Sequence, residues 1–217
     1  MKDEKIKKEK KITTGNFDLE EIMDCLEDNV KEDIVDFSDV INLKCSLDRE
    51  IFLGDITVGT GALIASIISF WNKMDKDIVN KYKEPIKIYI DSEGGSLTDT
   101  FTIIDAISLS DIPVYTIVTG TAYSGGCLVA LSGHKRYAFP HASFMLHEGS
   151  TSTGGDSHKF INYSKFYQKQ LNQLKDIVIK HTNMTDEFYE SIKRDDYWLS
   201  ADEAIEKGII DEIVEKK

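Results

Sequence analysis

The strongest constraint on the fold is a repeated unit in which a short β-branched apolar run is followed by a helical pattern. Residues 86–90 read IKIYI and precede a helix expected over about 97–109. Residues 114–118 read VYTIV and precede a helix expected to end near Ser132. A strand that is followed by a crossover helix and another strand builds a parallel sheet. The repetition therefore predicts an α/β fold with a mostly parallel sheet.

The rest of the chain extends this architecture. Further short strands are predicted at 50–53, 135–138 and 143–146, and Ile209-Ile210 with Ile213-Val214 are predicted to finish the fold as a strand. Apolar residues at helical spacing predict helices over 18–36, over 58–74 as a buried helix, over 158–181, and from Thr185. Ser200–Glu203 matches a capping box and opens a last helix that ends at Gly208, and 73–83 is expected as a charged loop.

Composition limits the kinds of partner. The 217 residues carry a formal net charge of −12, which repels phosphate backbones, so no nucleic acid partner is expected. No uninterrupted apolar stretch reaches the roughly 18 residues that span a bilayer, and the N-terminus does not resemble a secretory signal. The odd set Cys25, Cys45 and Cys127 lacks C-x-x-C spacing, which argues against a disulfide framework and a zinc site. We expect a cytoplasmic protein without membrane association or metal.

Three segments are expected. Residues 1–16, mostly Lys and Glu in their first part, predict a disordered charged tail. Residues 17–49 form an N-terminal segment that contains the helix expected over 18–36. Residues 50–217 form the main domain. Packing against that domain and a docking or gating role are both open for the 18–36 helix.

Ser124 is the first candidate for chemistry. It stands in the sequence Ala122-Tyr123-Ser124-Gly125-Gly126, between an expected strand and an expected helix. Small residues two positions before and after a serine allow the sharp turn of a nucleophile elbow. The N–H groups of the following helix could stabilise an oxyanion. A serine that only caps the helix is the alternative.

Gly94 and Gly95 occupy the same place after the neighbouring strand. Glycine lets the backbone approach a ligand closely, although a tight turn needs glycine as well. Both turns follow the carboxyl ends of parallel strands and should face one crevice. The N–H groups of Gly95 and Gly125 are therefore candidates for an oxyanion hole.

A serine nucleophile needs a base, and the base needs a carboxylate that orients it. His147 directly follows the apolar run Phe144–Leu146, whereas the other four histidines lie in polar surroundings and are expected at the surface. A structural role for His147 is the alternative. Asp195 and Asp196 both qualify as the orienting carboxylate, and spacing alone does not separate them.

Taken together and in order, these motifs resemble the proteolytic subunits of the Clp protease, in the ClpP/crotonase-like superfamily. The resemblance covers roughly residues 50–214. It rests on Ile51–Gly54, Ile88–Ser92 running into Gly94–Ser96, Ala122 with Ser124–Gly126, Met145–His147, and Asp196–Ala201 with Glu203, Ala204 and Gly208.

The resemblance implies a ClpP/crotonase-like fold of repeated β-β-α units with a protruding handle helix over 158–181. It implies a Ser-His-Asp triad of Ser124, His147 and Asp196, which prefers Asp196 to Asp195. It also implies that the N–H groups of Gly95 and Gly125 form the oxyanion hole. The implied activity is that of a serine endopeptidase, which cleaves unfolded polypeptides and binds no cofactor.

The resemblance also implies partners. Family members form homo-oligomers of seven-membered rings that can pair into a tetradecamer, with active sites inside a chamber. An AAA+ unfoldase can deliver substrate, and ATP is then hydrolysed by that partner, because this chain has no G-x-x-x-x-G-K-[ST] loop.

The chain departs from the family pattern in four places. Glu93 stands where proline is usual, Gly125 where methionine is usual, and Glu148-Gly149 where Gln-Pro is common. The first 50 residues match the family's N-terminal region poorly. Such divergence fits a phage or plasmid-borne member that processes one target, such as a capsid precursor. A non-catalytic ring or scaffold subunit and an acyl-CoA enzyme of the crotonase type are the alternatives.

Overall fold

The computed structural model describes residues 45, 48–152 and 154–215, without the side chain of residue 81. The chain divides into two compact units, Met1–Asp48 and Arg49–Lys217. The fold described here is that of the second unit. The tail predicted over 1–16, the helix predicted over 18–36 and Cys25 lie outside the described residues.

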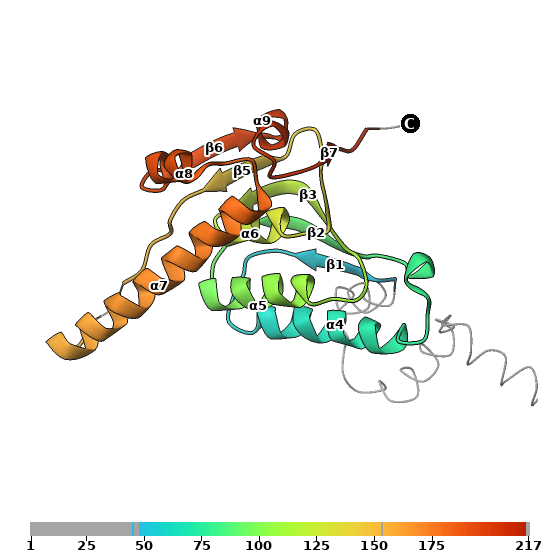
Figure 1. Cartoon of the computed structure of the whole chain (residues 1–217), viewed down its shortest axis with the longest axis horizontal. Helices are drawn as coiled ribbons and strands as arrows, with labels where there is room; N and C mark the ends of the chain where they lie inside the picture. Colours follow the sequence, from blue (N-terminus) through green and yellow to red (C-terminus); the bar gives the residue numbers. More distant parts are fainter. Residues whose placement is uncertain (1–44, 46–47, 153, 216–217) are drawn as a thin grey trace, which may run out of the picture. The chain divides into compact units, whose positions relative to one another are not determined.

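One mostly parallel sheet organises the second unit (Figure 1), so the fold is of the α/β class that the sequence predicts. Within the described residues its main path runs β1-β2-β3-β4-β7, and every neighbouring pair on this path is parallel. A branch leaves β3 through β5 to β6, and only the β5–β6 pair is antiparallel among the described strands. The strands are β1 Glu50–Leu53, β2 Ile86–Ser92, β3 Val114–Tyr123, β4 Lys135–Ala138, β5 Ser143–Leu146, β6 Tyr197–Ser200 and β7 Glu212–Ile213.

Strand β3 is longer than the expected run 114–118, and its extra length creates the branch. Its first half pairs with β4, and its last residues, Thr121–Tyr123, pair with β5. The extension is polar and therefore resembles a loop in the sequence. It stays extended because it pairs with β5 and because Asp91 Oδ1 accepts hydrogen bonds from the N–H and the hydroxyl of Thr121, at 2.8 and 3.0 Å. The extension carries Ser124 to the end of β3 that faces β5.

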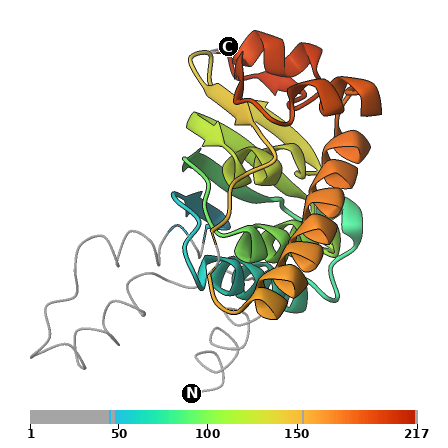
Figure 2. The ribbon, with the colours of Figure 1, turned by 90° about the vertical axis from the view of Figure 1, so that its left-hand side faces the viewer.

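Helices follow most strands, as the sequence predicts. Helices α4 and α5 lie side by side along one face of the sheet, and α7 runs obliquely past the edge of the body (Figures 1 and 2). The helices are α4 Thr60–Met74, the 3₁₀ turn η1 Asn80–Tyr82, α5 Leu97–Ser108, α6 Gly125–Leu131, α7 Ser157–His181, α8 Asp186–Ile192 and α9 Ala201–Glu206. The capping box predicted at Ser200 is confirmed, since its hydroxyl accepts from Glu203 N–H while Glu203 accepts from Ser200 N–H.

The core lies between the sheet and these helices. On β2, Ile86, Ile88 and Ile90 are fully buried, whereas Lys87 and Tyr89 on the other face are partly exposed. This alternation is the period of two that a strand imposes on its side chains. Buried isoleucines on one face therefore anchor the strand whose end leads into Gly94 and Gly95.

Three predictions about local structure are wrong. The helix predicted as buried over 58–74 starts at Thr60 and buries only one face, because Leu63 is 62% exposed while Ile64 and Ile68 are buried. The charged loop predicted over 73–83 contains the end of α4 and the turn η1. Of the strand predicted at 209–210 and 213–214, the pair Ile209-Ile210 is not a strand but lies buried in the turn that follows α9, and the strand lies one residue earlier than predicted, at Glu212–Ile213.

Candidate active site

Ser124 occupies a strained turn between β3 and α6. Its φ of 51° and ψ of −120° are uncommon for a residue with a side chain, and such values are typical of functional turns. Its N–H donates to the Met145 carbonyl at 2.9 Å, which fixes the turn to strand β5. The hydroxyl makes no side-chain cap of α6, and its only recorded partner within the described residues is His147.

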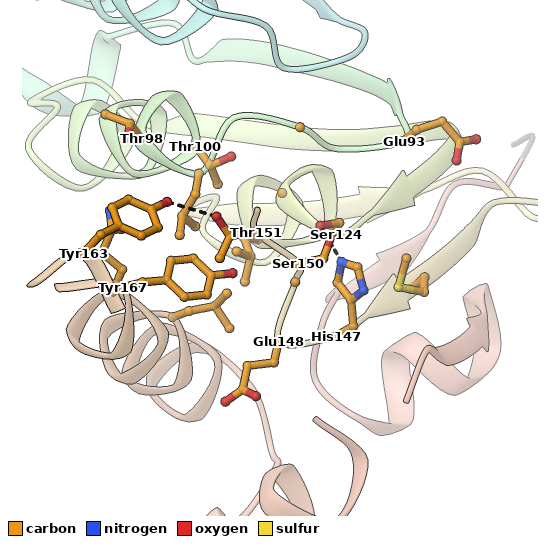
Figure 3. Close-up of a pocket in the computed structure, with 18 residues that line it drawn as sticks. Glu93, Thr98, Thr100, Ser124, His147, Glu148, Ser150, Thr151, Tyr163 and Tyr167 are labelled. Atoms are coloured by element: carbon orange, nitrogen blue, oxygen red, sulfur yellow. Dashed lines mark hydrogen bonds between the residues drawn. The ribbon is translucent and has the colours of Figure 1, made fainter. Parts of the chain in front are cut away.

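His147 follows β5 and contacts Ser124 directly (Figure 3). The register pairs Tyr123 with Met145, and His147 lies two residues further along, on the same side of the strand as Met145. His147 Nε2 is 2.8 Å from Ser124 Oγ. Residues 23 positions apart in sequence are thus brought within hydrogen-bond distance by one strand pairing.

Asp196 meets the other nitrogen of the same imidazole. The antiparallel β5–β6 register ends at Leu146 opposite Tyr197, so the next residues in line are His147 and Asp196. His147 Nδ1 is 3.1 Å from Asp196 Oδ1. A carboxylate only accepts, so in the tautomer that pairs with Asp196 the hydrogen is on Nδ1, which leaves Nε2 to accept from the Ser124 hydroxyl. Asp196, and not Asp195, therefore lies beside His147.

The side chains of His147 and Asp196 differ in exposure. The His147 side chain is 25% exposed and the Asp196 side chain is 54% exposed. Solvent can therefore reach the Asp196 carboxylate. Its contact with the imidazole depends on the position of the loop that precedes β6.

Gly94 and Gly95 form the turn that touches Ser124. The N–H of Ile56 donates to the Gly94 carbonyl and the N–H of Ser96 donates to the Ile56 carbonyl, so this bridge does not use the Gly95 N–H. Gly94 has a φ of 98° and Gly95 a φ of 138°, and a Cβ on Gly94 would lie 2.8 Å from Ser124 Cβ. Both positions thus require glycine, and the turn passes directly beside the Ser124 side chain.

Gly125 is the first residue of α6, so its N–H has no partner within the helix. A Cβ on Gly125 would lie 3.6 Å from Gly95 N and only 2.6 Å from Thr100 Oγ1. The two predicted oxyanion N–H groups therefore belong to adjacent turns. Thr100, which is fully buried on α5, fills the space that a side chain at position 125 would need.

A cavity of about 440 Å³ opens beside Ser124, between the sheet and α7. Figure 3 shows Tyr163 and Tyr167 of α7 on the side opposite His147, and Tyr163 hydrogen-bonds Thr151 at 2.9 Å. Burial raises the pKa of Tyr167, with smaller contributions from Tyr163 and the Glu148 charge. Other lining residues are Glu93, Gly95, Leu97, Thr98, Thr100, Ser124, Gly125, Leu128, Met145, His147, Gly149, Ser150, Gln170 and Leu174.

Sequence reasoning missed several of these features. Thr100 was not singled out, and no local pattern marks a buried threonine as the neighbour of a glycine 25 positions later. Tyr163 and Tyr167 lie in the helix predicted over 158–181, and their spacing of four, which is typical of an apolar helix face, also fits a cavity wall. The surface prediction for the other histidines is wrong for His181, which is half-buried and whose pKa is lowered by burial and by nearby Lys180 and Arg136.

Within the described residues, no group of three or more His, Cys, Asp and Glu side chains is arranged to hold a metal ion. Burial raises the pKa of Cys127, which lies in α6 away from solvent. In the described part of the chain, no helix is both long and apolar enough to cross a bilayer.

The architecture and the site define a class. A mostly parallel sheet carries a serine in a strained strand-to-helix turn, a histidine within hydrogen-bond distance and a protruding helix over a cavity. The family model for Clp protease matches residues 43–217. The ATP-dependent Clp protease proteolytic subunit 2 of Prochlorococcus marinus (strain MIT 9312) is 33% identical over 180 residues, which is 80% of this chain and 85% of that protein. The chain belongs to the Clp protease family, and its fold is the ClpP fold.

Proposed function

We propose that this chain is a serine endopeptidase whose triad is Ser124, His147 and Asp196. The observation that carries the proposal is the 2.8 Å contact between Ser124 Oγ and His147 Nε2, made by a serine held in a strained turn. Membership of the Clp protease family supports peptidase chemistry. A non-catalytic ring or scaffold subunit would not require this contact.

The reaction starts when Ser124 Oγ attacks the carbonyl carbon of a peptide bond and His147 Nε2 takes the hydroxyl proton. The carboxylate of Asp196 stabilises the imidazolium that forms. The N–H groups of Gly95 and Gly125 donate to the oxyanion. His147 then protonates the leaving amine and an acyl-enzyme remains. Water attacks that ester with His147 again as base, which releases the second product and restores Ser124.

The cavity between the sheet and α7 is the proposed place for the polypeptide substrate. It adjoins Ser124 and is large enough for several side chains, since binding clefts span about 300–1,000 Å³. The proposed reaction needs no cofactor and no metal. ATP would be used by an AAA+ unfoldase, and the relative named above is by its name a subunit of an ATP-dependent protease.

Assembly into rings that can pair into a tetradecamer is part of the proposal. The outer half of α7 supports it, because four large apolar side chains there are between 37% and 56% exposed, namely Phe160, Ile161, Tyr163 and Phe166. Exposed apolar patches of this kind mark surfaces that other chains cover. A second copy of this chain is the proposed partner.

A fluorophosphonate probe tests the triad, because it reacts covalently with an activated serine. We expect labelling of the wild-type chain at Ser124 and no labelling of Ser124→Ala. Hydrolysis of small fluorogenic peptides should fall by about 10⁶-fold in Ser124→Ala, with an unchanged assembly state. Equal hydrolysis by the two proteins would contradict the assignment.

A further inference from the structure

Beyond the triad, a second tether joins the two segments that carry His147 and Asp196. The β5–β6 ladder ends at the pair Leu146–Tyr197, and the chains then part. They meet again where the Glu148 N–H donates to the Lys193 carbonyl at 2.9 Å. His147 lies between these two tethers on one segment, and residues 194–196 lie between them on the other. The two backbone pairings therefore enclose both His147 and Asp196.

The side chains of Glu148 and Lys193 reinforce this second tether. Lys193 Nζ lies 3.5 Å from Glu148 Oε1 and 2.8 Å from Glu190 Oε2. The Lys193 and Glu148 side chains are only 20% and 25% exposed, so solvent screens their attraction less than that of an open surface pair. Glu190 and Glu148 raise the pKa of Lys193, which keeps it charged.

Asp196 needs such support. Its side chain is more than half exposed, and His147 is the only side chain recorded as its partner within the described residues. Only Lys193–Asp196 connect the end of α8 to the start of β6. The position of Lys193 therefore limits how far Asp196 can move from His147 Nδ1.

We propose that Lys193, through its pairing with Glu148, is a positioning residue for the His147–Asp196 pair. This inference rests on the proposed function of that site. Lys193 touches neither the substrate cavity nor the reacting atoms. It acts by holding the loop that carries Asp196 against the segment that carries His147. Loss of the charge lets the loop drift and lengthens the 3.1 Å contact between the imidazole and the carboxylate.

The test compares Lys193→Met with Lys175→Met in the full chain. Lys175 pairs with Asp186 and with the same Glu190, but no contact with Glu148 is recorded for it in the described structure. We expect Lys193→Met to lower kcat on a small fluorogenic peptide by about 10- to 100-fold with little change in KM, since small misplacements of reacting groups have effects of this size. Lys175→Met should keep the wild-type kcat, and Lys193→Arg should restore most of the loss.

A wild-type kcat in Lys193→Met, or an equal loss in Lys175→Met, would overturn the inference. If Lys193→Met unfolds at the assay temperature, Lys193→Gln decides, because it removes the charge that pairs with Glu148, keeps a polar side chain and leaves the cavity lining unchanged. Lys193→Gln should then lower kcat, and an unchanged kcat would overturn the inference as well. Failure of the wild-type chain to react with the fluorophosphonate contradicts the proposed function instead, so the two failures are distinguishable.

Discussion

The Ser124 N–H donates to the Met145 carbonyl at 2.9 Å, which ties the turn at the end of β3 to the strand that leads into His147. Because this is a bond between backbone atoms, it does not depend on the side chain at position 124. The spacing of Ser124 and His147 is thus set by the sheet. Side-chain substitutions at the site should consequently change the chemistry while the frame of the site persists.

Asp196→Asn should lower kcat by about 10⁴-fold, as the equivalent change does in a well-characterised triad protease. The amide of asparagine can turn an N–H toward His147, which favours the wrong tautomer of the imidazole. Asp195→Asn is the matched control, because no contact between the Asp195 carboxylate and His147 is recorded among the described residues. The measurement is kcat on a small fluorogenic peptide, and equal losses in both variants would reject the assignment of Asp196.

The ambiguity between Asp195 and Asp196 shows what the residue pattern alone could resolve. Ser124 and His147 each stand beside a recognisable strand, so short-range patterns were enough to single them out. The choice of Asp196 depends on the antiparallel register of β5 and β6, in which Leu146 faces Tyr197. Local spacing does not encode this register, because it depends on where the chain returns after α7 and α8. The choice came from family resemblance instead.

The remaining errors have a similar cause. Strand β3 continues through polar residues to Tyr123 because β5 and Asp91 pair with it, and these partners are distant in sequence. Hydrophobic periodicity does not predict that Leu63 on α4 is exposed, because it shows which residues are apolar and not which of them other elements cover. Local patterns therefore predicted most helices and strands. Long-range pairing determined where these elements end and which aspartate lies beside His147.

Gly125→Ala should destabilise the protein, because its Cβ would lie 2.6 Å from the buried Thr100 Oγ1. Overpacking of a filled site costs about 1–3 kcal/mol in unfolding free energy. Thr100→Ala opens space at the same point. The double variant should therefore be more stable than the sum of the two single changes predicts. Urea denaturation of the four proteins measures this coupling, and strictly additive losses would show that the two residues do not compete for space.

Protonation of the Asp99 carboxylate should lower the stability of the fold at acidic pH. The Ser96 hydroxyl, and then the N–H groups of Gly61 and Gly59, donate to it and lower its pKa. A carboxyl whose pKa is lowered by folding stabilises the protein above its unfolded pKa of about 3.9. That contribution is lost as the pH falls through the lower folded pKa.

Asp99→Asn should consequently lower Tm at pH 7 and flatten the decline of Tm below pH 4. Thermal unfolding between pH 7 and pH 3 checks both effects. Asp111→Asn is a control, because it changes the same charge and no hydrogen bond of its carboxylate is recorded in the described structure. A parallel decline in wild-type and Asp99→Asn would mean that Asp99 does not carry this acid sensitivity.

Substitutions in the two halves of α7 should separate folding from assembly. Leu174 is 4% exposed, so Leu174→Ala should lower the unfolding free energy by about 2–5 kcal/mol. Phe166 is 56% exposed, and Phe166→Ala should leave the secondary structure intact while it weakens the proposed contact between copies. Light scattering after size-exclusion chromatography measures the mass, and circular dichroism checks the fold. If Phe166→Ala keeps the wild-type mass at all concentrations, another surface must join the subunits, because the outer half of α7 would then be dispensable for assembly.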